Sequence, residues 1–393
     1  MISTVYIAKN VYGGDGLGRL GDGRVVFVPG AFAGESVKAE IVGEKKRYVK
    51  ARLIEVVEPS PERVDISSAN VVPGMVYAGL SHRAEREAKE LQLREFFERA
   101  RIEVPDFRTS PPSNPFNYRN KVVYHFAKVG GDWRIGYRTE PSHEVVDVAV
   151  DPLAVPEINA ALPEIRRNVL RLLTTGPAAV RRETEHKGKL TVRWTRKTGV
   201  KWWVGDAPKG LVLRENTCGK DFDVPADGFY QVNPAMGEAL VAAVSEITGP
   251  DCPEVIDLYC GVGVFGLCSG AKSVTGIESG RQAIDFARAN AARLGIAANF
   301  YSAQVGRNLG RLKITPSTTV IVDPPRGGLE PNVPRFLARS SAERIIYVSC
   351  DPATLMRDLS SICRGYRVEQ VRWFDMFPRT ARFETLAVLE KIK

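Results

Sequence analysis

Four short apolar runs in the carboxyl-terminal part of the chain constrain its fold most strongly. The runs EVIDL, SVTGIE, TTVIVD and IIYVS are rich in β-branched residues and bounded by turn residues, which is typical of strands buried inside an α/β sheet. A carboxyl or thiol side chain lies at the end of each run or one position from it: Asp257, Glu278, Asp323 and Cys350. Because open α/β sheets keep their sites at the carboxyl ends of their strands, the pattern predicts a doubly wound α/β domain with a site at that edge.

Cys350 lies at the end of the last of these runs, in the stretch IIYVSCDPATL. Asp351 and Pro352 end the strand, and residues 353–359 favour a helix. A cysteine just before a helix amino terminus experiences the positive end of the helix dipole, which favours the thiolate. A buried, inert cysteine is the competing interpretation, since free cysteine is among the most buried residue types.

Length and composition limit the class of protein. A chain of 393 residues predicts two or three domains, and 44% apolar with 26% charged residues is typical of soluble globular proteins. No run of eighteen apolar residues and no secretory signal is found, so we expect a cytoplasmic protein that does not enter a membrane. A formal charge of +9 is compatible with a polyanionic partner, although many cytosolic proteins are mildly basic. The cysteines lack close paired spacing, as expected in a reducing compartment: Cys218, Cys252, Cys260, Cys268, Cys350 and Cys363.

Residues 2–58 alternate short β-rich runs with glycine turns, which predicts a small barrel with strands near 3–10, 25–28, 36–44 and 48–57. Lys45, Lys46 and Arg47 cluster at one turn, either as a phosphate-contacting patch or as a solvated basic loop. Beyond it, a helix is predicted over about 84–100 and strand-like alternation over 117–150. There Arg119 and Lys121 flank aromatic residues, a combination suited to contacting RNA.

The turn after the run ending in Asp257 contains Gly261 and Gly263, and glycine there lets the backbone approach a ligand closely. Glu278 ends the next run about 20 positions later, where an acidic side chain suits the hydroxyls of a ribose. The turn is not a full G-x-G-x-x-G motif. A nicotinamide-dependent enzyme is therefore a poor fit.

Five motifs together resemble the RNA uracil-5-methyltransferase family, the 23S rRNA 5-methyluridine enzymes among its members: FYQVN, DLYCGVG, DPPRGG, SCDP and FPRTARFE. The first part of the chain resembles the TRAM domain, through GDGLGR, VFVPG and GESV. The resemblance covers essentially the whole chain. It implies an OB-like TRAM barrel over 1–58, a mixed α+β RNA-binding domain over 59–228, and a Rossmann-like S-adenosylmethionine methyltransferase domain over 229–393. It also allows the helix at 84–100 to dock on the catalytic domain in place of the central one.

The resemblance assigns roles to individual residues. It makes Cys350 the nucleophile and Glu384 the proton acceptor. It implies a set of residues that bind S-adenosylmethionine: Gln231, Tyr259, Gly261, Glu278, Gln304 and Asp323. It implies an RNA substrate, with 23S rRNA favoured over tRNA because bacterial members specialised for tRNA generally lack the TRAM domain. We further expect a monomer.

The chemistry explains why these residue types are required. Carbon 5 of uracil is too weakly nucleophilic to attack a methyl sulfonium unaided, but thiolate addition at carbon 6 makes it enolate-like. After methyl transfer, a base must remove the proton left on carbon 5 before the thiolate departs. The target base must also leave its stack to reach such a pocket.

Two departures from the family pattern stand out. Many members hold an iron–sulfur cluster with four cysteines, but residues 1–217 contain no cysteine and Asp151 stands where the later ligand is expected. We therefore predict that the cluster is lost. The family usually has histidine two residues before the base, where this chain has Arg382, which is expected to hold Glu384 ionised and to compete for it.

Two other functions compete with uracil methylation. Loss of the cluster and Arg382 are compatible with a non-catalytic RNA-binding or ribosome-assembly protein, whereas retention of Cys350, Glu384 and the donor motifs opposes it. The DPPR motif is also near the tetrads of amino-methylating enzymes. Those enzymes need no cysteine nucleophile, so SCDP discriminates against them.

Overall fold

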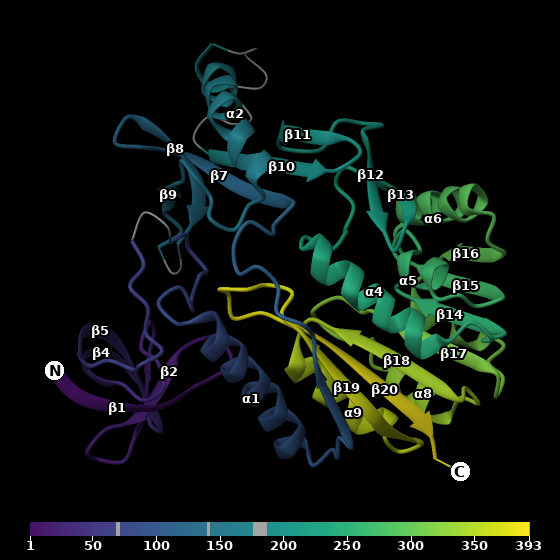
Figure 1. The fold of residues 1–393 in the computed structure, drawn as a ribbon, viewed down its shortest axis with the longest axis horizontal. Coiled ribbons are helices and arrows are strands. Elements are labelled where there is room, and N and C mark those ends of the chain that lie inside the picture. Colours follow the sequence, from purple (N-terminus) through teal and green to yellow (C-terminus); the bar gives the residue numbers. More distant parts are fainter. Residues whose placement is uncertain (68–70, 140–141, 176–186, 393) are drawn as a thin grey trace. The chain divides into compact units, whose positions relative to one another are not determined.

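A computed structural model describes residues 1–67, 71–139, 142–175 and 187–392, and the chain divides into two compact units (Figure 1). Unit 1 contains Met1–Glu95 together with Phe377–Phe383, and unit 2 contains Phe96–Met376 with Glu384–Lys393. A short segment near the carboxyl terminus therefore belongs to the amino-terminal unit. The predicted domain boundaries at residues 58 and 228 remain a prediction.

The amino-terminal strands of unit 1 close into the predicted barrel, in the order β1-β2-β3-β5-β4. Their bounds are β1 Ile2–Asn10, β2 Gly16–Arg19, β3 Val25–Val28, β4 Ser36–Glu44 and β5 Tyr48–Glu58. Alternate apolar side chains, among them Val5, Ile7, Val26, Val37 and Val49, form its core. The predicted amino-terminal β-barrel is therefore confirmed.

Strand β2 was not predicted, because its sequence GLGR is typical of a turn. A Cβ at Gly16 would lie 2.7 Å from the carbonyl oxygen of Ala31, and one at Gly18 would lie 2.5 Å from that of Tyr6. These glycines are thus required by close backbone approach inside the barrel, not by turn geometry. The predicted helix at 84–100 is confirmed as α1, His82–Ala100, which begins in unit 1 and ends in unit 2. Docking of this helix on the catalytic domain stays a prediction.

The first part of unit 2 is an antiparallel sheet in the order β11-β10-β7-β8-β9. Its strands are β7 Lys121–Val129, β8 Asp132–Arg138, β9 Val145–Asp147, β10 Lys187–Thr195 and β11 Gly199–Val204. Helix α2, Pro156–Thr175, packs against β10 and β11 through a stripe of buried apolar residues that includes Leu162 and Val169. A hairpin of β12 Val212–Thr217 and β13 Lys220–Pro225 follows.

The carboxyl-terminal sheet has eight strands in the order β16-β15-β14-β17-β18-β20-β19-β6. The five neighbouring strands β16, β15, β14, β17 and β18 are parallel to one another. Strand β20 lies between β18 and β19 and is antiparallel to both. The strand bounds are β14 Glu254–Leu258, β15 Ser273–Glu278, β16 Ala298–Ser302, β17 Thr318–Val322, β18 Arg344–Ser349, β19 Tyr366–Phe374, β20 Glu384–Lys391 and β6 Asp106–Thr109. The four runs identified in the sequence are β14, β15, β17 and β18, as predicted.

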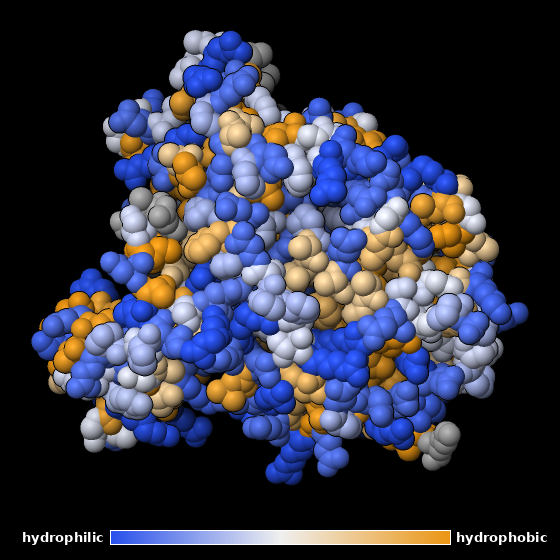
Figure 2. Space-filling model, viewed as in Figure 1, coloured by the Kyte–Doolittle hydropathy of each residue, from blue (hydrophilic) through white to orange (hydrophobic). Residues whose placement is uncertain are grey.

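Helices connect these strands, with bounds α4 Pro234–Thr248, α5 Val264–Cys268, α6 Arg281–Leu294, α7 Val305–Asn308, α8 Val333–Arg339 and α9 Pro352–Ile362. Figure 2 shows a weakly hydrophobic area over the alanine-rich helix α4 on an otherwise mostly hydrophilic face. Within the described ranges, no helix has both the length and the apolar character needed to span a membrane. The strand order changes direction between β14 and β17, and a ligand crevice is expected at such a switch point.

Candidate active site

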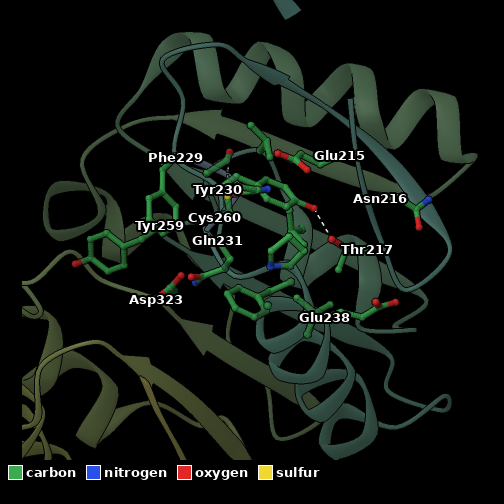
Figure 3. A pocket seen from close by; sticks show the side chains of 18 residues that line it. Glu215, Asn216, Thr217, Phe229, Tyr230, Gln231, Glu238, Tyr259, Cys260 and Asp323 are labelled. Atoms are coloured by element: carbon green, nitrogen blue, oxygen red, sulfur yellow. Dashed lines mark hydrogen bonds between the residues drawn. The ribbon is translucent and has the colours of Figure 1, made fainter. Parts of the chain in front are cut away.

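A pocket opens at the switch point between β14 and β17 (Figure 3). The space between its lining atoms amounts to about 670 Å³, including open solvent at its mouth. Figure 3 shows Gln231, Tyr259 and Asp323 on one side and Thr217 with Glu238 on the other. Four of the residues predicted to bind the methyl donor line this pocket: Gln231, Tyr259, Gly261 and Asp323.

The glycine turn after β14 forms one wall of the pocket. Its backbone is left-handed at Tyr259 (φ 64°), Gly261 (φ 52°) and Gly263 (φ 87°). No atom lies within 4 Å of where a Cβ at Gly261 would stand, so this backbone faces open space. The buried carboxylate of Asp257 accepts a hydrogen bond from the backbone N–H of Gly266 (2.9 Å), which ties β14 to α5. Burial raises the pKa of Asp257 to about 7.

Tyr259 is held by a residue that sequence reasoning missed. Its hydroxyl donates to Oε2 of Glu330 (3.0 Å), and the same oxygen accepts the backbone N–H of Gly306 (2.7 Å). Asn332 donates to the carbonyl of Gly306 (2.7 Å). Glu330 therefore joins the glycine turn to α7, and nothing in the loop sequence GGLEP indicates this contact.

Glu278 and Gln304 lie at the ends of the neighbouring strands instead of in the lining of the pocket. Glu278 ends β15, and its Oε1 accepts the backbone N–H of Gly280 (2.7 Å). The register pairs Glu278 with Ser302, two residues before the exposed Gln304. These two side chains therefore belong to the same carboxyl-terminal edge of the sheet as the pocket.

Cys350 and Glu384 are brought together by the pairing of two antiparallel strands. Ser349 at the end of β18 pairs with Thr385 of β20, which places Cys350 beside Glu384, the first residue of β20. Asp323 and Arg326, from the loop after β17, act electrostatically on both side chains. The parallel β17–β18 pairing brings this loop to the same edge of the sheet.

The Cys350 thiol is protonated in this site. Burial, followed by the charges of Glu384 and Asp323, raises the pKa of the thiol to about 12, and Arg326 acts in the opposite direction. The amide groups at the start of α9 bind the side chain of Asp351, which accepts from the backbone N–H groups of Ala353 (3.0 Å) and Thr354 (3.2 Å). The expectation of a thiolate stabilised by the helix terminus is therefore wrong for the site without substrate.

Glu384 is likewise shifted toward its protonated form. Burial and then the charge of Asp323 raise its pKa well above the usual range, while Arg326 opposes them. Burial, followed by Asp257, raises the pKa of Asp323 to about 7. The edge of the sheet thus gathers two carboxyl groups and a thiol that burial and mutual repulsion keep from ionising together.

The predicted action of Arg382 on Glu384 stays a prediction, and the contact that the structure gives for Arg382 is with Tyr12. Arg382 Nη1 donates to the hydroxyl of Tyr12 (2.8 Å), and the guanidinium lies over the Tyr12 ring at 5.6 Å. Both residues belong to unit 1. The cation that lowers the pKa of Glu384 is Arg326, and its effect is smaller than that of burial.

The residues predicted to contact RNA differ in their exposure. Lys45, Lys46 and Arg47 are exposed at the turn between β4 and β5. Lys121 is half-buried, and its Nζ donates to the carbonyl oxygen of Gly228 (3.4 Å), just before the FYQVN motif. Arg119 is half-buried against Tyr118, whose hydroxyl accepts from its Nε (3.3 Å).

Asp151 stands where the later cysteine ligand of the iron–sulfur cluster is expected, and its carboxylate is engaged in hydrogen bonds within the protein. Its Oδ2 accepts hydrogen bonds from the hydroxyls of Tyr124 (3.0 Å) and Tyr137 (2.6 Å), and Oδ1 accepts the backbone N–H of Leu153 (2.9 Å). The residues around this position therefore do not fit such a cluster. In the part of the chain that the structure describes, no group of three or more His, Cys, Asp or Glu side chains could hold a metal.

Comparison with known proteins places this chain, with its doubly wound domain and small closed barrel, among the RNA methyltransferases. Residues 219–392 match the tRNA (Uracil-5-)-methyltransferase family profile, and residues 4–54 match the TRAM domain. An uncharacterized RNA methyltransferase of Gloeobacter violaceus is 30% identical over 99% of this chain and 96% of its own length. A 23S rRNA (uracil(1939)-C(5))-methyltransferase of Pseudomonas entomophila is 29% identical over 96% of this chain and 91% of its own.

The fold agrees with this relationship. The crystal structure of Pyrococcus abyssi tRNA (uracil-54, C5)-methyltransferase in complex with S-adenosyl-L-homocysteine superimposes with a TM-score of 0.77 at 24% identity, covering 98% of this chain and all of that one (100%). The chain belongs to the S-adenosylmethionine-dependent RNA uracil-5-methyltransferase family.

Proposed function

We propose that this protein transfers the methyl group of S-adenosylmethionine to carbon 5 of a uridine in RNA, with Cys350 as nucleophile and Glu384 as base. The observation that carries the proposal is the β18–β20 pairing, which sets Cys350 beside Glu384 at the edge of the sheet that also holds the donor pocket. Asp323 links the two regions, since it lines the pocket and acts on both side chains.

The pocket suits the methyl donor. Open space at Gly261 leaves room for a ligand against the backbone, and Glu278 stands where a ribose diol would be bound. Gly237 supports Gln231, since a Cβ at Gly237 would lie 2.9 Å from the Cβ of Gln231. The donor supplies an electrophilic methyl sulfonium when bound.

The steps follow from the chemistry of the two side chains. The Cys350 thiol gives its proton to solvent, its sulfur bonds to carbon 6, and the electrons of the carbon 5–carbon 6 double bond move into an enolate. Carbon 5 then takes the methyl group, and the demethylated donor leaves. Glu384 removes the carbon 5 proton, the double bond re-forms, and the carbon 6–sulfur bond breaks to release Cys350 as thiolate.

Both side chains must release a proton to solvent before they act, Cys350 as nucleophile and Glu384 as base. Cys350 has a pKa raised to about 12 and Glu384 one raised well above its usual range, so each holds a proton in the site without substrate. Arg326 is the cation that favours the ionised form of both. We therefore assign Arg326 the role of stabilising the Cys350 thiolate and the Glu384 carboxylate when RNA is bound.

The RNA substrate is proposed to be 23S rRNA, on the relationship to the Pseudomonas entomophila enzyme and the TRAM barrel. A uridine of tRNA is the second candidate, because the fold also matches a tRNA enzyme over its full length. The protein is proposed to act in the cytoplasm as a monomer.

The test uses purified protein, total RNA and S-adenosylmethionine labelled in the methyl group, followed by nucleoside analysis. Label in 5-methyluridine is the expected result. Label in an N-methylated base would identify an amino-methylating enzyme, and absence of transfer would support a non-catalytic RNA-binding protein. Deleting the gene and comparing 5-methyluridine in 23S rRNA and tRNA then identifies the substrate, with loss from tRNA alone contradicting the 23S rRNA proposal.

A further inference from the structure

Unit 1 contains a fully buried ion pair on α1. Lys89 Nζ lies 2.7 Å from Glu85 Oε1, and neither side chain is exposed (0% for each). A buried pair of this kind contributes little net stability, since desolvation offsets most of the attraction. The role of the Glu85–Lys89 pair is therefore to be sought in the other groups to which the two side chains are hydrogen-bonded.

Both side chains bind the backbone of the segment Phe377–Phe383. Glu85 Oε1 accepts the backbone N–H of Arg379 (2.6 Å), and Lys89 Nζ donates to the carbonyl of Phe377 (3.2 Å). The Tyr77 backbone N–H donates to the carbonyl of Arg379 (3.1 Å).

The side chains of the same segment add further contacts. The buried Arg379 side chain donates to the carbonyl of Leu80 (2.6 Å). Arg379 also adopts a left-handed backbone (φ 67°), which a non-glycine residue keeps only where its surroundings hold it.

The far end of the segment is held by the barrel. Arg382 donates to the hydroxyl of Tyr12 (2.8 Å), and the Phe383 ring meets the Tyr12 ring edge-on with centroids 5.7 Å apart. Phe383 is the last residue of the segment, and the next residue along the chain is Glu384, where the chain returns to unit 2. Unit 1 thus binds the chain up to the residue before the proposed base.

We propose that Glu85, Lys89, Arg379 and Tyr12 are positioning residues that hold the segment Phe377–Phe383 so that Glu384 reaches the carbon 5 proton. This inference rests on the proposed function. It makes the amino-terminal unit part of the elimination step, through the segment that carries the base. Nucleophilic attack by Cys350 does not depend on the segment, because Cys350 follows β18 within unit 2.

The consequence is a specific kinetic defect. When Glu384 is displaced, Cys350 still adds to carbon 6 and the methyl group still transfers, but the carbon 5 proton stays and the carbon 6–sulfur bond persists. A displacement of about 1 Å in a catalytic group can cost on the order of 10²-fold in rate. Loosening the segment should therefore trap a methylated covalent RNA adduct, which a loss of general stability would not produce.

The main variant is the double substitution Glu85→Gln with Lys89→Met, which removes both charges of the buried pair. It also removes the ion-pair partner of the buried Arg379 guanidinium, which lies 3.5 Å from Glu85 Oε2, and so loosens the segment Phe377–Phe383 at a further contact. Its matched control is Glu35→Gln, since Glu35 is also a fully buried carboxylate of unit 1 and is paired with Arg63 (2.5 Å). Glu35 binds Arg63 and the backbone N–H groups of Phe32 and Ser60, none of which belongs to the segment Phe377–Phe383. Tyr12→Phe is a milder variant that removes only the hydroxyl bound by Arg382.

The measurements are turnover, melting temperature, and the fraction of protein that migrates with RNA on denaturing electrophoresis. We expect the double variant to lose about 10²-fold in turnover while accumulating the donor-dependent adduct, Tyr12→Phe to show a smaller adduct fraction, and Glu35→Gln to show none.

Equal turnover losses without adduct in the double variant and the control, or unchanged turnover in the double variant, would overturn the proposal. If the double variant does not fold, an adduct fraction of Tyr12→Phe no higher than that of wild type overturns it. Failure of the wild-type protein to make 5-methyluridine would instead refute the proposed function.

Discussion

The donor pocket and the Cys350–Glu384 pair share one edge of the sheet but are built in different ways. Behind the wall of the pocket, polar side chains are bound to the backbone, as Asp257 is to Gly266 and Glu330 is to Gly306. In the pair, burial and neighbouring carboxyl groups raise the pKa of both members. Under the proposed function, the pocket is therefore preorganised for the methyl donor, whereas the pair has to be activated when RNA binds.

The largest expected effect comes from removing the nucleophile. Cys350→Ala should lower methyl transfer by on the order of 10⁴-fold or more, because carbon 5 is no longer activated. Binding of the donor should be unchanged, since the pocket keeps its lining. Cys363→Ala is the control, a half-buried thiol on the far end of α9 that should leave turnover near normal. Substantial methyl transfer by Cys350→Ala would show that carbon 5 is activated without Cys350.

The protonation state of the pair gives the next effect. A thiol pKa of about 12 at Cys350 leaves its thiolate about 10³-fold scarcer near neutral pH than that of an unperturbed cysteine. Alkylation of Cys350 by iodoacetamide, followed by peptide mass spectrometry, should thus be slow and should rise about tenfold per pH unit between pH 7 and 9. Arg326→Ala should slow it further, because Arg326 lowers this pKa. Rapid alkylation that levels off below pH 8 would contradict the account.

A smaller effect is expected from loosening the pocket. Glu330→Ala removes the acceptor shared by Tyr259 and Gly306, and the loss of such charged hydrogen bonds should raise the KM for the donor about tenfold. The KM for RNA should stay the same. Tyr259→Phe should have a smaller effect, and adding it to Glu330→Ala should cost little more, because both changes remove the same hydrogen bond. Fully additive effects would show that Glu330 does not act through Tyr259.

The smallest effect should come from the barrel surface. Replacing Lys45, Lys46 and Arg47 by alanine should weaken RNA binding a few-fold and flatten the salt dependence, by about one unit of slope for each phosphate that the protein no longer neutralises. The KM for the donor should not change. Replacing Arg167 and Arg171, exposed on α2, is the control for loss of positive charge. An unchanged salt slope in the triple variant would favour the solvated-loop interpretation of these residues.

The sequence predicted those parts of the molecule that local pattern determines. The four buried strands, the helix at 82–100 and most of the barrel follow from hydrophobic runs and turn residues. Strand β2 was missed because the close packing that requires its glycines comes from residues distant in the chain. The same limit explains why Glu330 was overlooked, since its partners lie on other loops.

The electrostatics of the pair were mispredicted for a similar reason. A helix terminus next to Cys350 suggested a thiolate, but burial and the charges of Glu384 and Asp323 prevail, and Asp351 binds the amide groups of the helix. Proximity along the chain also suggested that Arg382 acts on Glu384, and it gave no sign that the Arg382 guanidinium binds Tyr12, 370 positions away in the same unit. Burial and long-range contacts of this kind cannot be read from neighbouring residues in the sequence.

The central claim is that Cys350 and Glu384 act at opposite ends of one covalent cycle. The most direct test incubates Glu384→Gln with RNA and S-adenosylmethionine and resolves the products by denaturing electrophoresis and mass spectrometry. The account predicts a protein–RNA adduct that carries the added methyl group and is absent when Cys350 is also replaced by alanine. Near-normal turnover of Glu384→Gln with no adduct would contradict it.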